Sequence, residues 1–141
     1  MRRMDEPEAR AWLGADVHNA VFATVRPDGR PHATPVWFTA DGDDFVFTTW
    51  HSTAKARNLR ASSEVMLVVQ DERPPYDYAV VEGRAQLLDD LPDCKRIARM
   101  LGAKYMGEDR AEAFAKRNGV EGELVVRIRP TRVYGFLGIA E

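Results

Sequence analysis

The sequence has almost no cysteine, no long apolar run and no strong excess of one charge. Cys94 is the only cysteine among 141 residues, which excludes an intrachain disulfide, a Cys-x-x-Cys redox pair and a thiolate metal cluster. A net charge of -2 gives no overall attraction to nucleic acid or to an anionic membrane. No apolar stretch approaches the ~20 residues of a membrane span, and the first residues lack the apolar segment of a signal peptide. We therefore expect a soluble cytoplasmic protein that binds neither nucleic acid nor membrane.

Sequence motifs of several common enzyme classes are also missing. The chain contains no G-x-G-x-x-G, no Walker sequence and no nucleophile elbow, which argues against the Rossmann, P-loop and α/β-hydrolase classes. Its three histidines, His18, His32 and His51, are widely spaced and have no acidic or cysteine companions. We predict no metal site and no catalytic side chain.

Hydrophobic periodicity and turn residues predict a mainly β (α+β) chain. Extended segments are expected at Val17–Arg26, Pro31–Thr39, Phe45–Thr49, Val65–Gln70, Tyr78–Leu88, Glu123–Arg129 and Arg132–Leu137, the last two separated by Pro130. Helices are expected after Asp5, from Ser52 or Thr53 to about Ala61, at Leu91–Met106 and at Glu108–Arg117.

This order of elements predicts one domain over residues 1–141. Consecutive strands with tight turns, together with short flanking helices, favour a small antiparallel barrel whose ends are covered by helices. The same pattern is compatible with an open α+β sheet.

The segment from His51 to Arg60 is the strongest candidate for a binding site. A strand ending in Thr48 and Thr49 leads into the start of a basic helix, where free N–H groups and the positive end of the helix dipole attract an anion. Lys55 falls in the first turn, and Asn58 lies one turn further on. The alternative is an ordinary solvated basic helix face.

Pro35 interrupts a segment that otherwise has the pattern of a paired strand. Proline cannot donate a hydrogen bond to a neighbouring strand, so it marks a sheet edge or a bulge. Backbone groups freed there could bind the edge of a planar heterocycle. The alternative is an edge strand that proline protects from aggregation.

The order of these features resembles one family. The segments that show the resemblance are Ala23–Val25, Asp28–Pro31, Pro35–Phe38, Lys55–Arg60, Tyr78–Ala85 and Pro130–Gly135. Together they are similar to the split β-barrel flavin and deazaflavin oxidoreductases of the pyridoxamine 5'-phosphate oxidase-like superfamily, and most of all to the coenzyme F420-dependent reductases. The sequence between Leu88 and Pro130 does not contribute to the resemblance.

The resemblance implies a cofactor site shared by two subunits of a homodimer. Lys55 and Asn58 would hold the cofactor phosphate with help from the two threonines, and the ring system would lie along Pro35–Trp37. A tyrosine of the partner subunit would line the same site. The implied cofactor-binding residues are Pro35, Val36, Trp37, Thr48, Thr49, Lys55, Arg57, Asn58, Tyr76 and Tyr78.

The resemblance further implies an F420-dependent oxidoreductase, in which reduced deazaflavin gives a hydride to a conjugated small-molecule acceptor. FMN is the alternative cofactor, because its phosphate and planar ring would use the same site. A non-catalytic protein that binds or stores flavin, F420 or haem is the second alternative. The sequence does not identify the acceptor.

Overall fold

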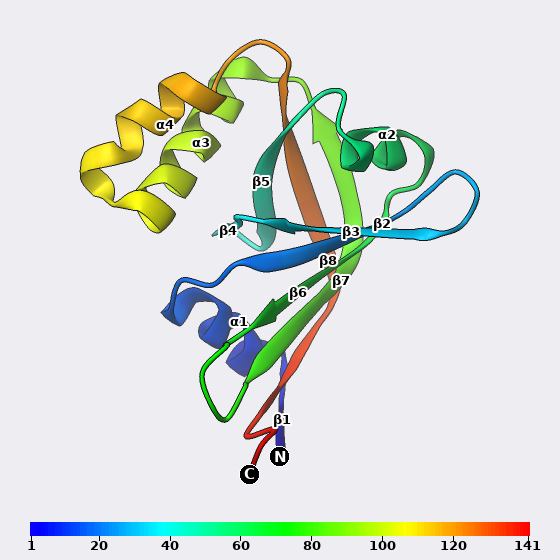
Figure 1. Cartoon of the computed structure of the whole chain (residues 1–141), viewed down its shortest axis with the longest axis vertical. Helices are drawn as coiled ribbons and strands as arrows, with labels where there is room; N and C mark the ends of the chain where they lie inside the picture. Colours follow the sequence, from blue (N-terminus) through cyan, green and yellow to red (C-terminus); the bar gives the residue numbers. More distant parts are fainter.

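An antiparallel sheet forms the centre of the molecule, which the computed structural model describes over residues 1–141 (Figure 1). The strands are β1 (Arg2–Met4), β2 (Ala20–Val25), β3 (Pro31–Val36), β4 (Thr39–Asp41), β5 (Asp44–Trp50), β6 (Glu64–Gln70), β7 (Tyr78–Leu88) and β8 (Glu123–Leu137). Their order is β3-β2-β6-β7-β8-β5-β4, with β1 also on β8. The end strands β3 and β4 do not pair, so the sheet is an open, split barrel in an α+β fold. This confirms the predicted fold class.

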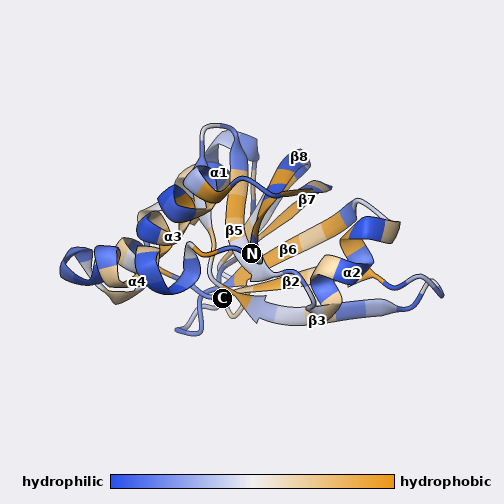
Figure 2. Cartoon of the chain, turned by 90° about the horizontal axis from the view of Figure 1, so that it is seen from above, coloured by the Kyte–Doolittle hydropathy of each residue, from blue (hydrophilic) through white to orange (hydrophobic).

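Four α-helices flank the sheet. They are α1 (Glu6–Ala15), α2 (Ala54–Ala61), α3 (Leu91–Met106) and α4 (Ala111–Asn118), with a short 3-10 turn, η1 (Glu108–Arg110), before the last. Helices α1, α3 and α4 lie on one side, and α2 lies on the other (Figures 1 and 2). The predicted caps are confirmed: Asp5 accepts a hydrogen bond from the Glu8 N–H at 3.0 Å, and Thr53 accepts one from the Ala56 N–H. None of the helices has both the length and the apolar character needed to cross a bilayer.

The core lies between the inner face of the sheet and the helices. Phe22 and Phe47 meet edge to face inside the barrel, with ring centroids 4.8 Å apart. Ile97 and Cys94 of α3 are also fully buried. Figure 2 shows the apolar colouring concentrated along the central strands, as expected for a sheet packed against helices.

The predicted break at Pro130 is wrong, because β8 runs through it without interruption. Pro130 pairs with Gly83 while Arg132 pairs with Glu82, so the register shifts at this point and the missing proline N–H is accommodated in a bulge. The bulge also requires glycine at position 83. A Cβ there would lie 2.4 Å from the carbonyl oxygen of Arg129.

Other boundaries also differ from the prediction, and β3 for example ends at Val36 rather than at Thr39. Strand β2 begins at Ala20 rather than at Val17, because the residues before it join α1 to the sheet and the carbonyl of His18 accepts a hydrogen bond from Tyr105. Short strands β1 and β4 were not predicted. Each has only three residues, too few to show an alternating pattern.

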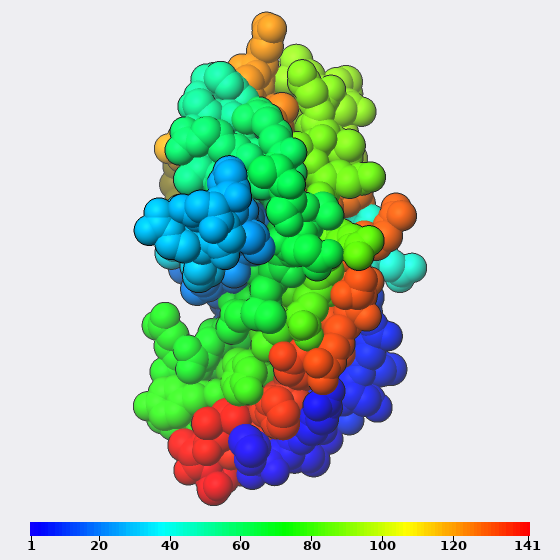
Figure 3. All heavy atoms as spheres, turned by 90° about the vertical axis from the view of Figure 1, so that its right-hand side faces the viewer, coloured from blue at the N-terminus to red at the C-terminus, as the bar shows by residue number.

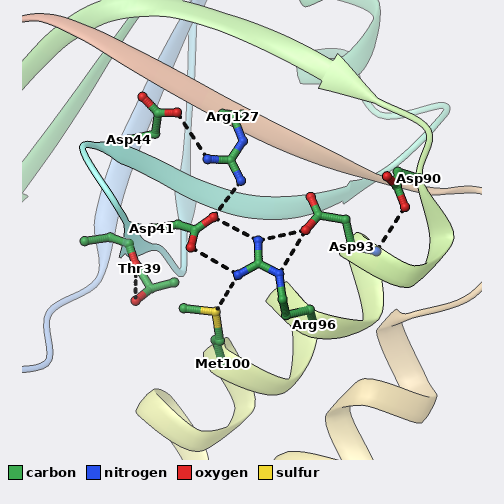
Figure 4. A network of polar contacts seen from close by, with 9 residues as sticks. Thr39, Asp41, Asp44, Asp90, Asp93, Arg96, Met100 and Arg127 are labelled. Atoms are coloured by element: carbon green, nitrogen blue, oxygen red, sulfur yellow. Dashed lines mark hydrogen bonds and ion pairs between the residues drawn. The ribbon is translucent and has the colours of Figure 1, made fainter.

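A network of ion pairs fastens α3 to the sheet (Figure 4). Arg96 of α3 binds both carboxylate oxygens of Asp41, at 3.1 and 2.9 Å. Arg127 of β8 binds Asp41 at 2.6 Å and Asp44 at 3.1 Å. The two guanidinium groups hold the pKa of Asp41 well below its usual range. This network joins β4, β5, β8 and α3, and it leaves none of the four groups unpaired.

Candidate functional site

A cavity of about 210 Å³ lies where the end of β3 and the middle of β5 approach α2, α3 and α4. It is lined by Pro35, Val36, Trp37, Phe47, Thr48, Lys55, Leu101 and Asn118. Five of the ten predicted cofactor-binding residues are therefore brought together by the fold, although they come from three separate elements. We call this space the Lys55 cavity.

The start of α2 supplies backbone donors beside this cavity. The Thr53 hydroxyl caps the helix by accepting from Ala56 N–H at 3.3 Å, and it also lies 2.9 Å from the hydroxyl of Thr49. The N–H groups of Ala54 and Lys55 have no acceptor within the helix, as is usual for a first turn. They combine with the positive end of the helix dipole to favour an anion.

Lys55 is the only cation that lines the cavity. Its side chain is partly buried and takes part in no ion pair within 4 Å; the nearest acid that acts on it is Glu123. Burial lowers the pKa of Lys55, and the charge of Glu123 opposes that change. Burial likewise raises the pKa of Glu123. An ammonium that is partly removed from water and has no direct partner is well suited to a bound phosphate.

The two threonines of β5 face opposite sides of the sheet, because side chains alternate along a strand. Thr48 points into the Lys55 cavity. Thr49 is buried on the inner face, where its hydroxyl contacts Thr53. Thr49 therefore supports the helix cap and does not line the cavity.

The side chains of Arg57 and Asn58 do not line the Lys55 cavity either. The Arg57 guanidinium donates to the carbonyl of Ser52 at 3.0 Å and so braces the turn that precedes α2. Asn58 is 5% exposed and donates from Nδ2 to the Thr24 hydroxyl at 3.0 Å. The Asn58 side chain thus attaches α2 to β2.

A second cavity, of about 430 Å³, lies between α2 and the β2–β3 turn, and Arg57 and Asn58 line it. His32 lines it too, and its buried Nδ1 has no hydrogen-bond partner within the chain. His32 points to the face of β3 opposite to Pro35, because the two positions are an odd number of residues apart. This cavity is consequently separate from the Lys55 cavity.

Pro35 and Trp37 form the β3 wall of the Lys55 cavity. Pro35 lies on an edge strand, as predicted, since β3 is the first strand of the sheet. The indole of Trp37 stacks on the ring of Tyr105, with centroids 4.8 Å apart and an interplanar angle of 2°. Tyr105 in turn donates from its hydroxyl to the carbonyl of His18 at 2.6 Å and accepts from the Phe38 N–H at 3.2 Å. Helix α3 therefore fixes the plane of the indole.

The sequence did not indicate this contribution from the two helices. Leu101 and Asn118 complete the cavity, and Tyr105 supports its indole, yet all three lie in the region that the family resemblance skipped. The helical spacing of Leu101 and Tyr105 predicted a buried face but not what that face covers.

Tyr76 and Tyr78 are not near the Lys55 cavity in the single chain. Tyr76 is exposed in the β6–β7 connection and adopts a positive φ of 65°. Tyr78 begins β7 and contacts the ring of Phe136, 5.6 Å away between centroids. No group of three His, Cys, Asp or Glu side chains is placed to hold a metal ion.

The sequence profile of the pyridoxamine 5'-phosphate oxidase family matches residues 6–136. The chain belongs to this family. No curated protein matches the sequence.

Several solved structures share the fold and differ in what they bind. A protein described as an F420 reductase is 29% identical, with a TM-score of 0.69, over 86% of this chain and 93% of that one. An FAD-binding protein from Mesorhizobium loti is 19% identical, with a TM-score of 0.71, over 95% of each chain. The haem storage protein HutZ from Vibrio cholerae is 14% identical, with a TM-score of 0.71, over 98% and 100%. The last two show the fold alone.

Proposed function

We propose that this protein is an F420-dependent oxidoreductase that reduces a conjugated small molecule. The observation that carries the proposal is Lys55, an unpaired and partly buried ammonium beside the free N–H groups of a helix start. The similarity to an F420 reductase at 29% identity supports the choice of cofactor. When bound, reduced F420 supplies a hydride to the acceptor.

The side chains of the Lys55 cavity suit the binding of a phosphate and a planar ring. The ammonium and the first amides of α2 hold the phosphate, and Thr48 adds a hydroxyl. Pro35 and Trp37 give the ring an apolar wall, and the stacked Tyr105 keeps that wall rigid. Asn58 and Thr49 act indirectly, because they hold α2 against the sheet.

We further propose that a second copy of the chain completes the site. A cavity of about 210 Å³ is smaller than the ~300 Å³ at which ligand pockets usually begin. One row of outward-facing apolar side chains crosses five strands, starting beside this cavity: Pro35, Val21, Val68, Val80 and Tyr134. Val21 is 44% exposed although β2 is paired on both sides, whereas Val80 is only 5% exposed. Figure 3 shows β6 and β7 (green) at the surface on this side.

An isologous pair of such faces would bury the row and place part of one subunit against the Lys55 cavity of the other. Tyr78 lies on the same face of β7 as Val80 and is carried to the interface with it. The mass in solution tests this step. We expect twice the mass of one chain, and we expect Val68→Arg to give the mass of one chain.

Calorimetric titration with F420 and with FMN tests the cofactor. We expect F420 to bind wild-type protein and the Lys116→Ala control, in which an exposed lysine of α4 is removed, but to bind Lys55→Ala much more weakly. Binding of neither cofactor, or equal binding by Lys55→Ala, contradicts the site. Tighter binding of FMN favours the flavin alternative.

Turnover separates an enzyme from a carrier. Reduced F420 is mixed with quinones, enones and tetrapyrroles, and its oxidation is followed by absorbance. Oxidation that depends on both the protein and the acceptor supports the reductase. Tight binding without turnover of any acceptor favours the storage function.

A further inference from the structure

The Lys55 cavity is not the only sizeable cavity of the chain. A space of about 550 Å³ lies between α1, the β4–β5 hairpin and the C-terminal part of α3, and no residue lines both cavities. Its apolar wall includes Leu13, Val17, Phe38 and Phe45. Two cations, Arg10 and Lys104, line it as well. In volume and in mixed lining it falls within the range of small-molecule sites.

Lys104 is the more buried of the two cations. Its Nζ donates to the carbonyl oxygen of Phe38 at 2.7 Å and lies 4.1 Å from the centre of the Phe38 ring. It forms no ion pair with a carboxylate, so two of its three N–H donors have no hydrogen-bond acceptor in the protein. Burial lowers the pKa of Lys104 to about 8. A carboxylate acceptor in the cavity would compensate this loss of hydration.

Arg10 reaches the same cavity from α1. It donates to the carbonyl oxygen of Asp43 at 3.1 Å, lies 3.5 Å from the exposed carboxylate of Glu6 and sits over the ring of Phe45. Asp16 and Asp43 also line the cavity. The Asp16 carboxylate is already paired with Arg73 at 2.6 Å, and Asp43 is exposed on the hairpin turn. Neither carboxylate neutralises Lys104.

We propose that the cavity lined by Arg10 and Lys104 binds a small carboxylate that carries an apolar chain or ring. The carboxylate accepts from the Lys104 ammonium and from Arg10, and the apolar part lies against Leu13, Val17 and Phe45. This ligand is distinct from the redox cofactor, because the two cavities share no residue. The proposal does not depend on the function assigned to the Lys55 cavity.

Competitive acetylation of the amines locates the ligand. The chain has only four lysines, Lys55, Lys95, Lys104 and Lys116, which mass spectrometry of peptides distinguishes. At pH 8, saturating octanoate is expected to slow acetylation of Lys104 about fivefold or more and to leave Lys95 and Lys116 unchanged. Absence of protection at Lys104, or protection of Lys55 instead, overturns the proposal.

Two controls test the charge and the site. Octyltrimethylammonium has an alkyl chain of similar length and the opposite charge, so equal protection by this cation would overturn the carboxylate assignment. Arg10→Gln is expected to weaken octanoate binding about tenfold by calorimetry, whereas Lys116→Gln leaves it unchanged. Arg10→Gln retains Lys104 and its contact with Phe38, so it provides a test even if Lys104→Gln fails to fold. Equal affinity in Arg10→Gln and wild type would contradict the role of Arg10.

Discussion

Charged side chains lie near both ends of strand β5, but those near its start are paired with opposite charges and the one beyond its end is not. At its start, the carboxylates of Asp41 and Asp44 are paired with Arg96 and Arg127 at 2.6 to 3.1 Å. Beyond its other end, Lys55 forms no ion pair, although it is partly buried. The two aspartates are thus neutralised by arginines of the same chain, whereas Lys55 has no carboxylate in direct contact.

This difference separates a structural role from a binding role. Charges that form ion pairs with each other connect elements of the fold and have no free hydrogen-bonding groups for a ligand. A desolvated charge without a partner has lost hydration and gains no ion pair in the free protein. The aspartates near the start of β5 should therefore affect the free energy of unfolding, and Lys55 should affect the affinity for the cofactor. Substitutions at the two ends test this division.

The largest effect is expected for Lys55→Ala. Loss of a charge-assisted contact to phosphate should weaken cofactor binding by about 2 kcal/mol, or roughly 30-fold. The unfolding temperature should not fall, since no ion pair is lost and a partly desolvated charge is removed. Calorimetric titration and thermal unfolding measure the two quantities. A lower unfolding temperature with unchanged cofactor affinity would show that Lys55 has a structural role and not a binding role.

Asp41→Asn should show the opposite pattern. It removes the negative charge shared by two guanidinium groups and replaces one acceptor oxygen by an NH2 donor. We expect a loss of about 1–2 kcal/mol in the free energy of unfolding, with unchanged cofactor affinity. Denaturant unfolding provides the measurement. A clear loss of affinity without destabilisation would show that the network also serves the site.

The stability difference between wild type and Asp41→Asn should also depend on pH. Ion pairing holds the pKa of Asp41 below its ordinary value of 3.8, so the stability that it contributes is fully present above that pH. This contribution is lost as the pH falls further, because the paired carboxylate must then take up a proton. The difference in stability between wild type and Asp41→Asn should therefore shrink below pH 3.8. A constant difference would contradict the assigned cause.

Asn58→Ala should have a smaller effect and, like Asp41→Asn, should change stability rather than cofactor affinity. Removal of the Asn58 amide leaves the buried Thr24 hydroxyl without its partner, which should cost about 1 kcal/mol of stability. Cofactor affinity should change by about twofold or less. A loss of affinity as large as that of Lys55→Ala would place the amide in the binding site.

Glu64→Gln should have the smallest effect. Glu64 pairs with Arg84 at 3.0 Å, but both side chains are more than 60% exposed. Such pairs are screened by water and salt and contribute little. Unfolding temperature and affinity should both match wild type within error. A measurable loss would mean that pairing alone, without burial, is enough to stabilise this fold.

Much of the fold was predictable because its elements carry their own local signals. The alternation of Tyr78–Leu88 and the helical spacing of Leu91–Met106 gave both elements with correct ends. Thr53 was one of the two predicted caps of α2. The continuity of β8 through Pro130 was not predictable, since it depends on a bulge opposite Gly83 in another strand.

Part of the candidate site was predictable for the same reason. Lys55, Thr48 and Pro35 belong to short motifs, and the fold brings them together. Thr49 and Asn58 belong to the same motifs but point inward, which a motif does not reveal. Lys104 had no local signal, because its environment is made by Phe38 and Arg10, far away in sequence.

The long pairing of β7 with β8 sets the order in which backbone amides exchange their hydrogens with heavy water. Both strands have hydrogen-bonded neighbours on each side over most of their length, so their amides are shielded unless the whole sheet opens. Amides of Val81 and Val126 should exchange last, at a rate that reports global unfolding. Helix α2 is attached to the barrel by few polar contacts, at Asn58 and at its cap Thr53, and should open first. Ligands that bind at its start should slow exchange in α2 far more than global stabilisation alone would require.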